Sequence, residues 1–206
     1  TAGALLIFQL NAYDFTAALL VPPKYDPAAS DAAAYGAIGS IIGHDVSHYV
    51  DLLGADYGPD GAARNWWTAA DRAGFDARTA PLVAQFEEYR PLPGLRIDGR
   101  RTRTENVADL AGLVAAFDAY RAARGEDHPD ADELRATDRE FFIAYAQGWR
   151  STSTDEGLRA QLATDNHAPD RYRVALVRNL DAWYQAFDVT PDDALYLAPA
   201  ARVRVW

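Results

Sequence analysis

The sequence has no cysteine and no methionine in its 206 residues. Without cysteine the chain has no disulfide bonds and no thiolate ligands, so any metal ion must be held by histidine, aspartate or glutamate. The absence of cysteine also gives no indication whether the protein works in an oxidising or a reducing compartment. Because the chain begins at Thr1 without a methionine, we expect a processed or partial polypeptide.

Basic residues are outnumbered, since 20 Lys and Arg stand against 30 Asp and Glu, with a net charge of −10 and a pI near 4.7. Phosphate backbones and anionic lipid surfaces attract clustered basic residues, so we expect no nucleic-acid partner. No apolar run approaches the ~20 residues of a membrane span, and no signal peptide is visible. We therefore expect no membrane span in this chain.

Apolar residues are plentiful, at 49% of the sequence, which is enough for a substantial core. The length suits one large domain or two small ones. Because no internal repeat and no interdomain linker is visible, we expect a single domain over residues 1–206.

The residues from Gly36 to Asp51 predict a helix with chemistry on one side. His44 and His48 are four residues apart, so both imidazoles project from the same side, one turn apart. Two neutral imidazoles at that spacing can bind one zinc ion. The residue after the first histidine is Asp45, where the zinc-peptidase helix H-E-x-x-H carries the glutamate that acts as general base. The apolar residues of this helix recur at helical spacing: Ile38, Ile41, Ile42, Val46, Tyr49 and Val50.

A bare H-x-x-x-H pattern is also typical of two hydrogen-bonded histidines in a core. Further residues are therefore needed to distinguish a metal site from a core pair. Glu105 and Asp109 are again four apart on a predicted helix. A glutamate can complete a His2Glu zinc site whose fourth position holds water. Asp109 can accept the free ring N–H of a ligand histidine, and Asp51 can do the same for His48. The alternative is a pair of solvated carboxylates, against which the apolar neighbours count.

His167 lies in a polar loop, six residues before Arg173. An imidazole beside zinc would stabilise a developing oxyanion, and Arg173 could pair with a substrate carboxylate. Taken alone, both are also typical of surface residues.

The remaining elements follow from periodicity and turn signals. An apolar run at 4–10 has strand character, and a second one at 15–21 stops at Pro22-Pro23. The segment 24–34 reads as a loop entering the central helix, which ends near Gly54 as its C-cap. Further helices are expected at 66–89 with Thr68 as N-cap, at 105–124 capped by Thr104, at 137–150 and at 174–187, with a polar loop over 125–132.

A series of segments, read in order along nearly the whole chain, resembles the catalytic domain of the M13 (neprilysin-like) zinc metallopeptidases. The matching motifs are N-A-Y at 11–13, A-x-x-L-x-P-P at 17–23, Y-G-x-I-G-x-x-I-G-H-[ED]-x-x-H at 35–48, D-G…W-W at 60–67, Y-x-P-L-P-G at 89–94, E-N-x-A-D at 105–109, F-F-x-x-x-A-Q-x-W-R at 141–150, T-D-x-H…R at 164–173 and R-V-x-x-W at 202–206. The resemblance implies a gluzincin fold of the zincin class, mainly α with a small mixed β-sheet.

The resemblance also implies one zinc ion, a peptide substrate and a role for each matching residue. Zinc ligands are expected at His44, His48 and Glu105. The implied roles of the others are these: Asp109 and Asp51 orient the histidines, Asp45 stands for the catalytic glutamate, His167 stabilises the transition state, Arg173 contacts substrate, and Asn11 with Ala12 hydrogen-bonds the substrate backbone by strand addition.

Several features depart from the family pattern. Asp45 is one methylene shorter than glutamate, and a shortfall of about 1 Å in a catalytic group can cost about 100-fold in rate. The segment between Asn11 and Phe15 is short, so a hairpin beside the substrate strand is missing. Thr16, Thr104 and Ala111 stand where the family has proline, glycine and glycine. The family's N-terminal helical lobe is also missing, and we expect it on a separate chain, in a lost segment, or replaced by an open cleft.

Three functions remain open at this point. The leading hypothesis is a zinc-dependent peptide hydrolase with Asp45 as a shortened general base. The second is a zinc-binding pseudopeptidase that holds peptides without cleaving them. The third is a metal enzyme that acts on a peptide-like metabolite.

Overall fold

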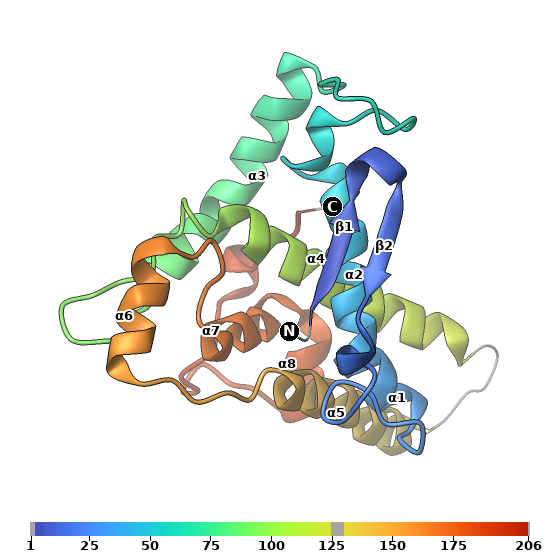
Figure 1. Ribbon diagram of the computed structural model, residues 1–206. Coiled ribbons are helices and arrows are strands. Elements are labelled where there is room, and N and C mark those ends of the chain that lie inside the picture. The colour runs from blue at the N-terminus through green and yellow to red at the C-terminus, as the bar shows by residue number, and fades with distance from the viewer. Residues whose placement is uncertain (1–2, 125–129, 206) are drawn as a thin grey trace.

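A computed structural model describes residues 3–124 and 130–205 of the chain, and Figure 1 shows mainly helices with one short hairpin. The elements are, in order, β1 (Ala4–Ile7), β2 (Ala12–Phe15), α1 (Asp31–Ala34), α2 (Ser40–Ser47), α3 (Ala69–Glu87), α4 (Arg103–Ala123), α5 (Ala131–Gly148), α6 (Asp155–Thr164), α7 (Asp170–Val174) and α8 (Asp181–Phe187). The expected fold class, mainly helical with a small sheet, is confirmed. The sheet within the described ranges is an antiparallel pair in which Ala4 lies opposite Phe15.

Helix α4 lies at the centre of the core. Its residues 105–113 are all buried, because α2 packs along it and α3 also contacts it. Farther along, Phe117 stacks on Phe142 and meets Phe141 edge to face, both from α5. Each such pair adds about 0.5–1.5 kcal/mol beyond the burial of its area. The first turns of α4 are therefore held rigidly inside the molecule.

Helices α2 and α4 touch through their backbones at a pair of glycines. A Cβ atom on Gly43 would lie 2.8 Å from the carbonyl oxygen of Gly112, and one on Gly112 would lie 2.3 Å from the backbone nitrogen of His44. Only residues without side chains permit this approach. The crossing places His44 directly against the buried half of α4.

The central helix begins earlier and ends earlier than expected. Ser30 accepts a hydrogen bond from the N–H of Ala33, so α1 starts inside the segment that we expected to be a loop. Helical turns then continue to Val50, through a π-helical turn between α1 and α2. Gly54 is not the C-cap, because the carboxylate of Asp51 accepts the N–H groups of Leu53 and Gly54 and ends the helix there.

The apolar residues of this helix do not all face the core. Ile42, Val46 and Val50 are each more than two-fifths exposed, whereas Ile38 is buried. The close contact with α4 at Gly43 turns the histidine side inward, and this rotation leaves that apolar row at the surface.

Caps explain which other boundaries were predicted correctly. Thr68 and Asp71 form a capping box, so the expected N-cap of α3 is confirmed, although the helix starts after Trp66. Thr104 is not a cap, because α4 already begins at Arg103. Asp130 caps α5 through the N–H of Glu133 and its neighbour, so α5 also starts before the expected boundary.

Two further segments differ from expectation. Helix α6 was not predicted. The helix expected over 174–187 is broken at Leu180, which is extended with φ −103° and ψ 120°. The neighbouring Asn179 side chain bonds Gln85 and the N–H of Val203, and this buried network fixes the break.

Part of the expected loop at 125–132 and the closing Trp206 lie outside the described residues. Within the described ranges, no helix combines the length and the hydropathy needed to cross a bilayer.

Candidate functional site

Three buried side chains bring their polar atoms to one point. The Nε2 atoms of His44 and His48 are 3.1 Å apart, and Oε2 of Glu105 lies 3.4 and 3.5 Å from them. Three ligands that bind one ion tetrahedrally, each at about 2.0–2.1 Å, are separated from one another by about 3.3 Å. The three atoms therefore have the spacing that a tetrahedral metal site requires.

The outer nitrogen of each imidazole is held by a carboxylate. Nδ1 of His44 lies 2.7 Å from Oδ1 of Asp109, and Nδ1 of His48 lies 2.7 Å from Oδ2 of Asp51. When each Nδ1–H donates to its carboxylate, each Nε2 of a neutral ring carries a lone pair. Two such lone pairs at 3.1 Å require a cation between them. The donor set thus fits a metal ion, and in its absence a proton takes that place.

The pKa values of the cluster follow from this geometry. Burial disfavours a charge on His48, but its bonds to Asp51 and Glu105 outweigh burial and raise its pKa to about 10. Burial also disfavours a charge on His44, but the nearby carboxylate of Asp109 outweighs burial and raises the pKa of His44. Burial favours the neutral form of Glu105, but three histidines hold its pKa well below the usual range. The site therefore pairs an ionised carboxylate with imidazoles that attract positive charge.

Arg173 anchors the carboxylate behind His44. Its Nε and Nη2 donate to the two oxygens of Asp109, both at 2.7 Å, and its guanidinium carbon lies 3.9 Å from the ring centre of Trp149. The Tyr145 hydroxyl donates to its carbonyl oxygen at 3.0 Å. Arg173 is thus a positioning residue for Asp109, and its expected contact with substrate stays a prediction.

Asp45 is buried beside the two histidines. His44, Asp45 and His48 each offer a ligand atom within 4.8 Å of the others. Oδ2 of Asp45 is buried and has no hydrogen-bond partner within the described residues, and such an oxygen costs about 1–3 kcal/mol unless a donor reaches it. Burial raises the pKa of Asp45 in spite of both histidines. Only a donor that enters the site can therefore satisfy this oxygen.

His167 reaches the cluster from the loop between α6 and α7. Its Nε2 lies 3.1 Å from Oε2 of Glu105, and its Nδ1 lies 3.0 Å from Asp165. The neighbouring Asn166 donates to Oε1 of Glu105 at 2.9 Å. No role for Asn166 was predicted from the sequence. The only feature of the sequence that indicates one is its position next to His167. Both oxygens of Glu105 are thus fixed by this loop.

Asn11 and Ala12 lie on the hairpin, and within the described residues their side chains form no hydrogen bond with the cluster. Asn11 has a left-handed backbone (φ 49°) at the turn, and it lines a cavity of about 400 Å³ with Phe8, Tyr49 and Trp66. Ala12 opens β2, which pairs only with β1 among the described strands. The hairpin lies along α2 (Figure 1), and among the described strands β2 has a partner on one edge, that of β1. Their role in binding substrate stays a prediction.

Comparison with known proteins matches this architecture. A model of peptidase family M13 matches residues 7–203. The neutral endopeptidase of Lactobacillus helveticus is 38% identical over 96% of this chain and 29% of its own length, and human endothelin-converting enzyme-like 1 is 34% identical over 95% and 25%.

Among solved structures, the zinc metalloprotease Zmp1 of Mycobacterium tuberculosis in its open state superposes with a TM-score of 0.92, at 43% identity, over 100% of this chain and 33% of its own. The chain thus spans about a quarter to a third of the length of these relatives. The chain belongs to peptidase family M13.

Proposed function

We propose that this chain is a zinc-dependent peptide hydrolase in which His44, His48 and Glu105 bind one zinc ion. The observation that carries the proposal is the mutual spacing of 3.1–3.5 Å between their three ligand atoms. The relatives named neutral endopeptidase and zinc metalloprotease support peptides as the substrate class.

Zinc, when bound, would polarise the scissile carbonyl and lower the pKa of a bound water. Asp45, which lies beside both histidines, is the residue that would take up a proton from a water at the site and return it to the leaving amine. A pKa raised by burial suits a group that must do both. Its side chain is shorter than the family's glutamate, so we expect slower turnover than a glutamate would give.

The other residues of the site stabilise charge or orient the metal ligands. His167 would donate its Nε2–H, which lies 3.1 Å from Oε2 of Glu105, to the developing oxyanion once Glu105 binds the metal. Its loop is positioned by the contacts of Asp165 and Asn166. Arg173 fixes Asp109, which fixes the ring of His44, and Asp51 fixes His48 from its own helix.

Incubation of the zinc-loaded protein with a mixed peptide library, with mass spectrometry of the products, tests the proposal. His44→Ala removes one ligand and serves as the control. We expect cleavage by the wild type and none by the control. A zinc-loaded protein that cuts no peptide would contradict the proposal.

One observation favours a second function, which is peptide binding without cleavage. The position of the family's general-base glutamate holds the shorter Asp45. In that case the wild type would bind peptides unchanged, and Asp45→Glu would restore cleavage.

A further inference from the structure

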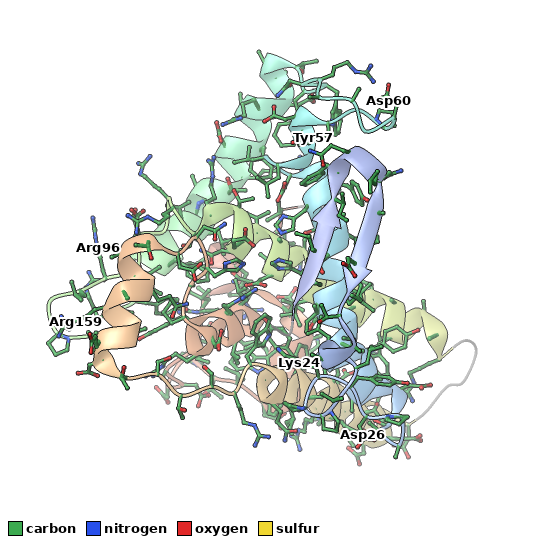
Figure 2. The ribbon with its side chains drawn as sticks, in the orientation of Figure 1. Lys24, Asp26, Tyr57, Asp60, Arg96 and Arg159 are labelled. Atoms are coloured by element: carbon green, nitrogen blue, oxygen red, sulfur yellow. The ribbon has the colours of Figure 1, made fainter. Side chains whose placement is uncertain are left out.

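Lys24 is the one lysine of the sequence, and it lies close to the site that we describe. It follows Pro22-Pro23, and Figure 2 shows it near the end of α5. Its Nζ lies 4.1 Å from the ring centre of Trp149. The stem of Lys24 also lies beside Gly148, where a Cβ atom would be 3.8 Å from its Cδ, an ordinary van der Waals contact.

Two cationic side chains, those of Lys24 and Arg173, thus lie over the indole ring of Trp149. Arg173 is neutralised by its two hydrogen bonds to Asp109. Lys24 has no hydrogen bond or ion pair with any side chain in the described ranges. Asp109 and Asp170 act on it only from a longer distance, while burial and the charge of Arg173 lower its pKa.

A half-buried cation without a counter-ion, beside a second cation, is electrostatically unfavourable. The neighbouring buried cation, Arg173, is by contrast paired with Asp109. An anion beside Lys24 would remove the cost. The surroundings of Lys24 therefore favour the binding of an anionic group.

Space for such a ligand lies beside the indole. A cavity of about 900 Å³ is lined by Trp149 and runs between the end of α5, α6 and α7. Two of its charged side chains are cationic, Arg150 and Arg171, against one carboxylate, Asp170. Lys24 lies near the metal site as well, because contacts run from Trp149 through Arg173 and Asp109 to the ring of His44.

We propose that Lys24 is a specificity residue that binds a carboxylate of the peptide, and that Trp149 and Arg173 position its ammonium group. This proposal rests on the proposed function, since it concerns the peptide at the same site. The carboxylate belongs either to an Asp or Glu side chain or to the peptide C-terminus. Both present the same chemistry to an ammonium group.

Four matched peptides distinguish these sources: one sequence with Glu or Gln at a single position, each with a free or an amidated C-terminus. Dissociation constants are measured by fluorescence anisotropy on the zinc-loaded protein in the Asp45→Asn background, which keeps the peptides from being cut during the measurement. We expect about tenfold tighter binding of the carboxylate that Lys24 recognises, as one charge-assisted hydrogen bond would give.

Lys24→Met should remove that preference and leave the binding of the Gln amide unchanged. Lys24→Glu should reverse it in favour of a peptide with Lys at the same position, which shows that the variant is folded. Equal binding of all four peptides by the wild type, or a preference that persists in Lys24→Met, would overturn the proposal.

A second readout is independent of cleavage. Because the chain has one lysine, [ε-¹³C]lysine labelling gives a single side-chain NMR signal. We expect this signal to shift and saturate with the recognised carboxylate peptide, and not with its neutral analogue. A protein that cuts peptides while the Lys24 signal stays unchanged would overturn this proposal and leave the hydrolase intact. A signal that responds without any cleavage would do the opposite.

Discussion

Asp45 combines a buried carboxylate, two neighbouring histidines and an oxygen without a donor in the described residues. We expect Asp45→Asn to lower kcat/KM by about 100-fold or more, the usual contribution of a general base, while bound zinc stays at the wild-type level. We expect Asp45→Glu to raise kcat, by up to about 100-fold, because it restores the missing reach. Kinetics with zinc analysis of each sample checks both. An Asp45→Asn variant as active as the wild type would exclude Asp45 as the base.

A second prediction at the residue scale concerns Arg173, because its removal leaves the buried carboxylate of Asp109 unpaired. We expect Arg173→Met to lower the free energy of unfolding by about 3–5 kcal/mol and zinc affinity by about 10–100-fold, since Asp109 then no longer fixes His44. Urea unfolding and chelator competition measure the two effects.

Arg171→Met is the matched control, since Arg171 lies on the same helix with an exposed side chain. Its stability and zinc affinity should stay close to those of the wild type. Equal losses in the two variants would contradict a positioning role for Arg173.

The sequence predicted the candidate ligands better than their supports. His44, His48, Glu105 and Asp109 lie at i,i+4 spacing on helices, and the fold brings them together. Asn166 and Lys24 act across loops far along the chain, where no periodicity links them to their partners. The metal-binding roles of the candidate ligands and the substrate role of Lys24 stay predictions until they are measured.

At the scale of elements, the contact between α2 and α4 sets the geometry of the site. A Cβ atom on Gly112 would lie 2.3 Å from the backbone nitrogen of His44. We expect Gly112→Ala to push the helices apart, lower the free energy of unfolding by about 1–3 kcal/mol and weaken zinc binding.

Gly74→Ala is the control for that substitution, because a Cβ atom on Gly74 meets nothing within 4 Å on α3. There the better helix propensity of alanine should stabilise the protein by about 0.5–1 kcal/mol. If Gly112→Ala also stabilised the protein, the close helix contact would be refuted. Chemical unfolding of both variants decides this.

Some of the elements that local signals specify were predicted, whereas those that tertiary contacts specify were not. The capping box of Thr68 and Asp71 could be read directly, because both partners lie within one turn. The end of the central helix at Asp51 and the break at Leu180 depend on side-chain bonds to backbone or to distant residues. Such bonds leave no periodic trace in the sequence.

At the scale of the whole molecule, zinc and protons compete for the same buried site. The metal-free pKa of His48 is about 10, against 6.5 for an ordinary histidine. Its protonated form therefore gives stability that is complete below about pH 6.5 and is lost as the pH rises to about 10. Zinc needs the neutral ring, so zinc must displace this proton throughout that window.

We therefore expect zinc affinity to rise about tenfold per pH unit for each proton displaced. The increase in Tm at a fixed excess of zinc should be larger near pH 8 than near pH 6. Thermal unfolding with and without zinc at the two pH values measures it. An equal increase at both would contradict a proton-linked metal site. That residues 1–206 form one domain stays a prediction, and a single cooperative transition in these scans would support it.

The most direct measurement is a zinc titration of the metal-free protein with peptide cleavage followed at each addition. The three ligand atoms at 3.1–3.5 Å predict one ion per chain. Cleavage should therefore rise in proportion to added zinc, reach a plateau at one equivalent, and stay absent in His44→Ala. Cleavage without zinc, or no cleavage of any peptide at one bound equivalent, would contradict the zinc-dependent hydrolase.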